Sequence, residues 1–348
     1  MWSPQSYVAA SVAACSLYLA YAYIYCSHKL LKTNVLNNDR LPSLVYLYMK
    51  YLAKALTRRT GRLYVASSPR RDVVYTLIGC RMETPLLRRF CSAAGYGWDY
   101  PDTDFRDVPL CFPEFLCRRL LLMVLTDKDF RLSPAGLVHV RQSLKTLQPV
   151  DELKKGPFML QVKVLEYRQT DAGVEVDICL TATARTGCSV WESVLTLLSK
   201  NKSHKGSPRT ESESHSDEPA SGGVKQVKLR VPWTAGQQYV WALCDVSSSW
   251  LLSLPARFFG SRLQASPSLW MLSACLAEIE KHKGVGVITA PVSVTARFKE
   301  PLPVPSRVKI AFWETTGNGS ESSAQGLSFH MQHDGSNASH VMGSILKS

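Results

Sequence analysis

The sequence lacks the short patterns that mark several common kinds of functional site. Its ten cysteines form no C-x-x-C pair, and no cluster of histidine, cysteine or acidic residues has metal-ligand spacing, so a metal site is not indicated. No phosphate-binding glycine loop occurs, and no G-x-S-x-G frame surrounds the serines at 247–249. These absences argue against phosphate-loop enzymes and serine hydrolases. We therefore expect neither a metal nor another cofactor.

Acidic residues are scarce relative to basic ones. The chain of 348 residues has 41 Lys and Arg against 28 Asp and Glu, which gives a formal net charge of +13. Such a balance favours anionic partners, which include nucleic acid, a membrane surface and anionic ligands. No zinc-finger spacing and no RNA-recognition run occurs, so we expect no nucleic acid partner. The scattered cysteines favour free thiols in a reducing compartment.

A long apolar run lies near the N-terminus. Residues 7–26 read YVAASVAACSLYLAYAYIYC and contain no charged side chain, and a helix of that length matches the hydrocarbon core of a bilayer. His28, Lys29 and Lys32 follow it, and this positive flank predicts a cytosolic location for the rest of the chain. Residues 1–30 are therefore predicted to be a single-pass membrane anchor, in an organelle that the sequence does not identify. A cleaved signal peptide is the alternative, although the run lacks a basic start and a clear cleavage site.

Residues 31–74 form a basic segment behind this run. Within it, the apolar residues of PSLVYLYMKYLAKALTRR (42–59) repeat at helical spacing, and the Lys and Arg residues lie mostly off that stripe. Such a juxtamembrane helix can lie on anionic lipid or pack on the domain that follows it, and both placements can hold together.

The remainder divides into two similar halves. Residues 203–223 are polar and rich in Ser, Glu, Gly and Pro, which predicts a disordered linker between an N-terminal half (75–202) and a C-terminal half (224–348). In each half a helical pattern precedes segments with strand-like alternation, so an α+β unit occurs twice. The predicted helices cover 113–127 and 267–281, and the predicted strands cover 136–140, 158–169, 174–185, 189–200, 225–232, 285–302, 307–316 and 326–335.

Longer signatures occur in both halves. The N-terminal half contains FPEFLCRRLLLMVLTDKDFRLSPAGLVHVRQSL and VWESVLTLLSK, and the C-terminal half contains YVWALCDVSSSWLLSLPARFFG and TAPVSVTARFKEPLPVPSRVKI. Together these stretches resemble the MaoC-like hydratases and dehydratases over residues 75–348. The resemblance implies a double hotdog, in which an antiparallel sheet wraps around a long helix twice, here behind an N-terminal transmembrane helix.

The resemblance places the candidate site in the C-terminal half. Tyr239, Asp245 and Gly260 stand at the family's tyrosine, catalytic aspartate and glycine positions. Ser247 replaces an asparagine, and Trp250 replaces the catalytic histidine. In the family the aspartate and histidine together add water to a thioester substrate. An indole does not titrate near neutral pH, so Trp250 does not supply the histidine's function.

Ser268 stands where the family's long helix begins. The resemblance implies that backbone N–H groups at this place hold the thioester oxygen, and Ser268 retains its own N–H. Arg257 and Arg262 are candidates for contact with the phosphates of a carrier such as coenzyme A, or else form a solvated basic face. The predicted substrate-binding set is Tyr239, Ser247, Arg257, Gly260 and Ser268. No other histidine is expected to replace the missing one, and His139 is interpreted as a histidine packed within a strand.

We therefore predict a membrane-anchored hotdog protein that binds an acyl chain, lipid or acyl thioester, with little or no hydratase activity. One alternative is an active enoyl- or (3R)-hydroxyacyl-thioester hydratase or dehydratase that uses Asp245. The other is a non-catalytic scaffold. A homodimer is a further expectation, because hotdog domains commonly pair.

Overall fold

The computed structural model describes most of the chain between residues 14 and 347. The described residues are 14–15, 18, 21–65, 72–97, 108–201, 224–231, 265–266, 268–316, 325–335 and 338–347. The predicted linker at 203–223 lies outside them, as does much of the predicted anchor at 7–26. Residues 21–30 are helical, and none of the helices within the described ranges is long and apolar enough to cross a membrane.

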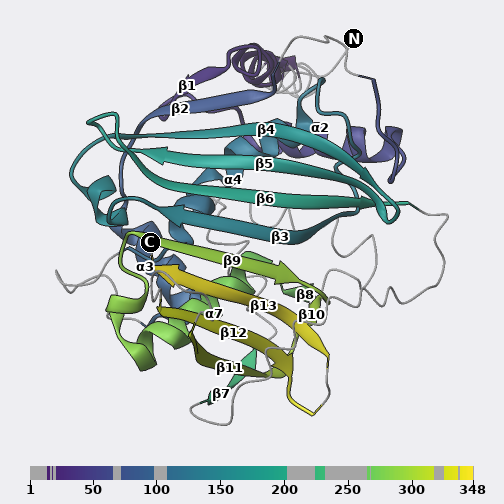
Figure 1. The fold of residues 1–348 in the computed structure, drawn as a ribbon. Coiled ribbons are helices and arrows are strands. Elements are labelled where there is room, and N and C mark those ends of the chain that lie inside the picture. Colours follow the sequence, from purple (N-terminus) through teal and green to yellow (C-terminus); the bar gives the residue numbers. More distant parts are fainter. Residues whose placement is uncertain are drawn as a thin grey trace, which may run out of the picture.

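The first half is an antiparallel sheet with a helix, α4, against one face (Figure 1). Its strands form where buried and exposed side chains alternate, as in β5, where Val176, Ile178 and Leu180 are buried. The elements are β2 (Val74–Cys80), α3 (Thr84–Ala94), α4 (Phe112–Thr126), β3 (Leu137–Thr146), η1 (Val150–Lys154), β4 (Phe158–Thr170), β5 (Gly173–Thr183) and β6 (Ser189–Lys200). A short strand, β1 (Val35–Asn37), extends the outer edge by pairing in parallel with β2.

The second half repeats this plan around α7. Every residue of α7 from Leu269 to Glu280 is buried, as expected for a helix enclosed on all sides. The elements are β7 (Lys225–Val231), β8 (Ala265–Ser266), α7 (Ser268–Lys283), η2 (Val285–Val287), β9 (Val292–Phe298), β10 (Leu302–Pro303), β11 (Ser306–Thr316), β12 (Gln325–His333) and β13 (Ser339–Lys347). β8 and β10 pair with each other as a small separate sheet.

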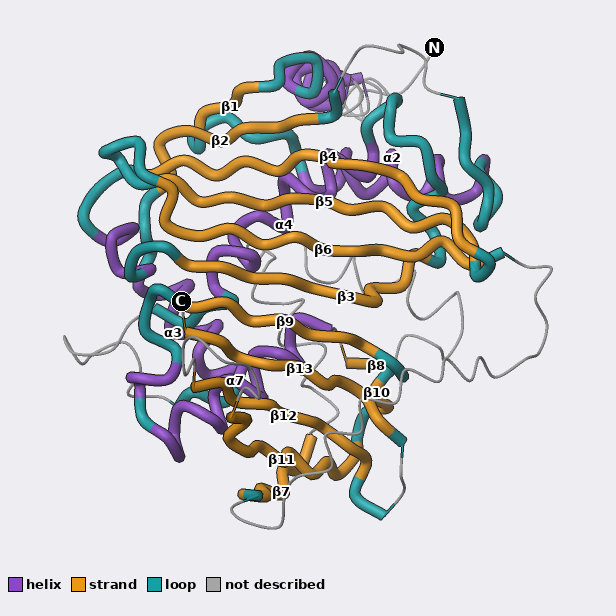
Figure 2. The backbone as a smooth tube through the Cα atoms, viewed as in Figure 1, coloured by secondary structure: helices purple, strands orange, loops and turns teal. Residues whose placement is uncertain are grey.

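Within the described residues, one continuous sheet of eleven strands joins the halves, in the order β1-β2-β4-β5-β6-β3-β9-β13-β12-β11-β7 (Figure 2). The halves meet at β3 and β9, which pair from Arg141 opposite Arg297 to Thr146 opposite Val292. We call this strand pair the seam. Outward from the seam the corresponding strands follow in the same order, β6-β5-β4-β2 on one side and β13-β12-β11-β7 on the other. The two halves are thus related by an approximate two-fold axis.

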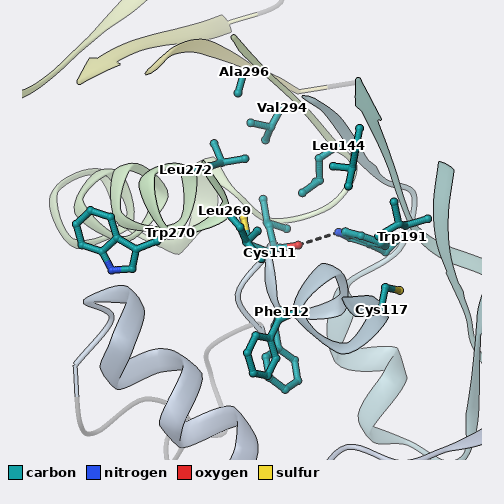
Figure 3. Packing of buried hydrophobic residues seen from close by; sticks show 14 of the residues in the cluster. Cys111, Phe112, Cys117, Leu144, Trp191, Leu269, Trp270, Leu272, Val294 and Ala296 are labelled. Atoms are coloured by element: carbon teal, nitrogen blue, oxygen red, sulfur yellow. Dashed lines mark hydrogen bonds between the residues drawn. The ribbon is translucent and has the colours of Figure 1, made fainter. Parts of the chain in front are cut away.

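The core beneath the seam is shared by both halves. Figure 3 shows its side chains, which include Cys111, Leu144, Leu272, Val294 and Ala296. Trp191 of β6 donates its indole N–H to the carbonyl oxygen of Leu110 at 2.7 Å. Trp270 of α7 donates its indole N–H to the carbonyl oxygen of Ala93 in α3 at 2.8 Å, which joins one half to the other.

The basic segment before the first half contains α2 (Leu44–Thr57), which packs against α4. Lys54 Nζ donates to the carbonyl oxygens of Leu125 at 3.2 Å and Phe130 at 3.1 Å, and Arg58 also donates to the Phe130 carbonyl. These carbonyls lie at and beyond the C-terminus of α4, where positive charge is favourable. Burial, together with a smaller effect of the nearby Arg58, lowers the pKa of Lys54 to about 7. Of the two placements open for this helix, packing on the domain is therefore observed.

Candidate functional site

The start of α7 lies at the end of the seam where β3 begins and β9 ends. Ser268 is the first residue of α7, and its Oγ lies 2.7 Å from Nδ1 of His139 in β3. The other ring nitrogen of His139, Nε2, lies 2.9 Å from the carbonyl oxygen of Arg141. Phe298, the last residue of β9, packs on the imidazole with the ring centroids 4.6 Å apart. This cluster therefore contains side chains from both halves of the fold.

The direction of these hydrogen bonds follows from the atoms involved. A carbonyl oxygen only accepts, so Nε2 of His139 carries the proton and donates to Arg141. Nδ1 then has a free lone pair, and the Ser268 hydroxyl donates to it. Burial lowers the pKa of His139 to about 4, with a smaller opposing effect from the Arg141 hydrogen bond. The imidazole is therefore a neutral hydrogen-bond acceptor toward Ser268 at physiological pH.

A β-bulge turns His139 toward the helices. His139 is opposite Leu197 of β6, Arg141 is opposite the adjacent Thr196, and Val140 has no partner between them. Beyond the bulge, residues at even positions of β3 are the buried ones. Regular alternation would place His139 on the outer face with Arg141, but the extra residue moves it to the inner face, as bulges commonly do. The sequence pattern alone therefore gave no signal that His139 belongs to a site.

The first turn of α7 adds positive electrostatic potential next to Ser268 and His139. Its backbone N–H groups have no acceptor within the helix. The helix dipole puts partial positive charge at the same end, which favours a carbonyl oxygen that gains negative charge. With the hydroxyl of Ser268 and the neutral ring of His139, the arrangement can hold a carbonyl group and accept a proton.

Most of the predicted site residues lie outside the described part of the chain. These are Tyr239, Asp245, Ser247, Trp250, Arg257, Gly260 and Arg262, and their roles stay predictions. Ser268 is described, and it begins the long helix as expected. His139, interpreted from the sequence as a packed residue, does pack on Phe298, but it also bonds Ser268. His139 is the residue that the structure adds to the candidate site.

A second polar cluster is buried in the first half. Glu114, in the first turn of α4, accepts a hydrogen bond from Nε2 of Gln142 in β3, and the same nitrogen lies 3.1 Å from Ser193 Oγ. Burial raises the pKa of Glu114 to about 7, although Arg118 acts in the opposite direction. Because Glu114 is only 5% exposed, we interpret the cluster as an internal connection between α4 and the seam.

A hollow of about 770 Å³ opens near the start of β3. The Gly61 N–H donates to Ser199 Oγ at 2.8 Å, and Ser199 pairs with Leu137, the first residue of β3. Arg59 and Arg62 are exposed at this hollow, so it suits an anionic group. The lining residues are Arg59, Thr60, Gly61, Arg62, Leu63, Gln169, Thr170, Gly173, Val174 and Asn201. No group of three or more His, Cys, Asp or Glu side chains in the described ranges is arranged to hold a metal ion.

Several solved structures resemble this chain over about four fifths of its length. HtdX of Mycobacterium tuberculosis has a TM-score of 0.56 at 16% sequence identity, over 78% of this chain and 98% of its own. A MaoC-like dehydratase from Phytophthora capsici has a TM-score of 0.56 at 15% identity, over 85% of this chain and 98% of its own. The peroxisomal multifunctional enzyme type 2 of Drosophila melanogaster has a TM-score of 0.53 at 13% identity, over 79% of this chain and 48% of its own.

No protein-family model and no curated protein matches the sequence. At sequence identities this low, structural likeness establishes the fold and leaves activity open. The structural comparison therefore confirms the resemblance to the MaoC-like dehydratases at the level of the fold. The chain has the double-hotdog fold of the MaoC-like dehydratases.

Proposed function

We propose that this protein binds an acyl thioester, with the thioester carbonyl at the N-terminus of α7. The observation that carries the proposal is the position of Ser268, which begins the central helix of the second hotdog and lies 2.7 Å from His139 of the first. The family resemblance puts the thioester oxygen at this helix start. The first-turn backbone N–H groups, which lack acceptors within the helix, and the helix dipole are suited to that oxygen.

The hollow near the start of β3 supports a phosphorylated carrier. Arg59 and Arg62 are exposed there, and Ser199 connects the turn at Gly61 to the strand that carries His139. We assign the phosphates of a carrier such as coenzyme A to this hollow, with the thioester reaching toward α7. Arg257 and Arg262 stay additional candidates for the same contact.

We further propose that hydration of the acyl group is slow or absent. The resemblance puts Trp250 where the family has its catalytic histidine, and an indole neither takes up nor releases a proton near neutral pH. Loss of one member of an acid–base pair typically lowers the rate by about 10²–10⁴-fold. An active hydratase that depends on Asp245 is the alternative.

Ligand binding is tested with the full-length protein in detergent. Octanoyl-coenzyme A at about a hundred times its Kd should stabilise the folded state by about 2.7 kcal/mol and raise the Tm by several degrees. Free coenzyme A should raise it less. Ser268→Pro removes both the N–H and the hydroxyl, and the first turn of a helix tolerates proline. We expect this variant to lose the shift, while its Tm without ligand falls only by the few degrees that loss of the hydrogen bond to His139 explains.

The control is Ser143→Ala, which changes a serine on the outer face of the same seam and should leave the shift intact. No shift with octanoyl-coenzyme A, or an undiminished shift in Ser268→Pro, contradicts the proposal. Hydration of trans-2-octenoyl-coenzyme A that disappears in Asp245→Asn would favour the hydratase alternative.

We also propose that residues 7–26 anchor the protein in a membrane, with α2 against the membrane surface. The uncharged run supports this location, and so does the outward face of α2, where Val45, Met49 and Leu56 are 41%, 60% and 76% exposed. The N–H of Ser43 at the start of α2 donates to Ser27 Oγ at 3.2 Å, which fixes the preceding helix beside it. The full-length protein should stay with the membrane fraction during alkaline carbonate extraction. Its release into the supernatant would exclude an integral anchor.

A further inference from the structure

Two hydrogen bonds in series connect the Ser268 hydroxyl to the backbone of β3. Oγ of Ser268 lies 2.7 Å from Nδ1 of His139, and Nε2 of His139 lies 2.9 Å from the Arg141 carbonyl oxygen. Because the carbonyl fixes the tautomer, the hydroxyl proton points at the free lone pair of Nδ1. A hydroxyl bonded to a base, with that base oriented by a third group, is the arrangement of an activated nucleophile.

The imidazole is held in this position from two sides. Phe298 packs on the ring with a centroid separation of 4.6 Å, and the bulge at Val140 sets the direction of the side chain. His139 and Ser268 are both partly exposed, so the pair is not sealed within the core. A ligand at the helix start can therefore reach the hydroxyl.

The start of α7 supplies the second requirement of acyl transfer. Attack on a thioester carbonyl creates an oxyanion, which backbone N–H groups stabilise when they are already in place. The first-turn N–H groups of α7, which have no acceptor within the helix, belong to the same turn as Ser268 Oγ. A carbonyl carbon next to Oγ would have its oxygen near these donors.

We propose that Ser268 is a nucleophile that accepts the acyl group of a thioester, with His139 as its general base. The proposal rests on the proposed binding of a thioester at this helix start. Oγ attacks the carbonyl carbon and forms a C–O bond while its proton passes to Nδ1 of His139. Collapse of the tetrahedral intermediate breaks the C–S bond, and the thiolate leaves as a free thiol with the proton from His139. The product is an ester of Ser268, formed without an oxidant or reductant.

Water regenerates the serine in a second step. His139 takes a proton from water as the water oxygen attacks the ester carbonyl, and Oγ leaves as a hydroxyl with that proton, which releases a carboxylic acid. In serine proteases a buried carboxylate stabilises the imidazolium that forms. Here the orienting group is the uncharged carbonyl of Arg141, so we expect slow turnover and accumulation of the acyl-serine.

The test uses full-length protein in detergent with octanoyl-coenzyme A. We expect one octanoyl group on Ser268, identified by intact mass and peptide mapping, together with an equal amount of released coenzyme A thiol. The exposed Cys15, Cys26 and Cys188 provide sites for non-enzymatic S-acylation. Neutral hydroxylamine distinguishes these products, because it cleaves thioesters and leaves the serine ester in place.

Substitutions of Ser268 and His139 test the role of each residue in acyl transfer. Ser268→Ala should abolish the hydroxylamine-resistant adduct, and Ser268→Cys should form a hydroxylamine-sensitive adduct at the same position. His139→Gln should slow acylation by about 10²–10⁴-fold, and the control Ser143→Ala should not change it. The Tm of each unliganded variant reports whether it is folded. If Ser268→Ala does not fold, Ser268→Cys alone decides, because the adduct must change from ester to thioester.

The ligand-induced change in Tm reports thioester binding independently of acyl transfer to Ser268. A ligand-induced rise in Tm without an adduct on Ser268 overturns the nucleophile and leaves thioester binding intact. An equal amount of hydroxylamine-resistant adduct in Ser268→Ala also overturns it. Absence of both the shift and the adduct contradicts the nucleophile and the proposed function together.

Discussion

Gln142 of β3 donates from one amide nitrogen to the carboxyl group of Glu114 in α4, and the same nitrogen lies 3.1 Å from Ser193 Oγ in β6. A single side chain thus joins the helix of the first half to two neighbouring strands. One of these strands, β3, forms half of the seam. A change in the protonation state of Glu114 therefore alters a hydrogen bond to the strand pair at the centre of the molecule.

Glu114→Gln is expected to change how stability depends on pH. Burial raises the pKa of Glu114 from 4.5 to about 7 on folding, so the folded protein holds this proton more tightly than the unfolded chain does. The resulting stability is present below about pH 4.5 and is lost as the pH rises through 7, a change of about 3 kcal/mol. The variant lacks this loss, so its stability relative to the wild type should increase between pH 5 and pH 8, as measured by urea unfolding. The exposed Glu83→Gln is the control, and equal pH slopes for Glu114→Gln and the wild type would contradict the assignment.

Gly343→Ala should be strongly destabilising. A Cβ atom at Gly343 of β13 would lie 2.2 Å from the Thr295 carbonyl oxygen and 2.5 Å from the Phe329 ring. Strand backbone cannot move aside at this place without breaking the pairing of β13 with β9. We expect a loss of at least about 1–3 kcal/mol in thermal or urea unfolding. Gly286→Ala, where no atom lies within 4 Å of the added Cβ, should cost far less, and similar losses for the two variants would refute the steric explanation.

Trp270→Phe removes a hydrogen bond between the halves. The buried indole of Trp270 donates to the Ala93 carbonyl at 2.8 Å, and phenylalanine leaves that carbonyl without its donor. Because Ala93 is only partly buried, we expect a loss of about 1 kcal/mol, the usual net contribution of one hydrogen bond, which guanidinium unfolding should detect. Trp313→Phe in β11 is the control for loss of the indole, because Trp313, which is partly buried, has no side-chain hydrogen bond to another described residue. An equal loss in both variants would mean that aromatic packing, and not the hydrogen bond, dominates.

The rate of the proposed Ser268 acylation should be nearly constant between about pH 5.5 and pH 8. Burial lowers the pKa of His139 from 6.5 to about 4, so the ring stays in its base form over this range. The Arg141 side chain bonds Glu175 at 2.9 Å on the other face of the sheet and does not add charge at the ring. Single-turnover measurements of thiol release would show the profile. A midpoint near 6.5 would indicate a solvated histidine and contradict the structure of the pair.

Most strands of the fold could be predicted, because the alternation of apolar and polar residues that marks a strand is visible within a few consecutive residues. The predicted segments 158–169, 189–200 and 307–316 appear as β4, β6 and β11 with ends that differ by no more than one residue. The segment 285–302 was predicted as one strand and is instead η2, β9 and β10. The continuous pairing of the two halves at the seam depends on residues far apart in the chain, so no local pattern reports it.

The site could be predicted only in part for the same reason. Ser268 was found through the family resemblance, and its place at the start of α7 agrees with that resemblance. His139 could not be assigned to the site, because one unpaired residue in β3 reverses the face that alternation predicts for it. The assignments of Tyr239, Asp245 and Trp250 stay predictions, since these residues lie outside the described ranges.

The separation of His139 and Ser268 along the chain has a consequence for the order of folding. The two residues are 129 positions apart, whereas the hairpins within each half join strands that are neighbours in sequence. Pairing across such distances requires closure of a long loop and is slower than local pairing. During refolding, acyl-thioester binding should therefore return after the circular-dichroism signal of the sheets. A newly synthesised chain should form the contact between His139 and Ser268 late in its folding.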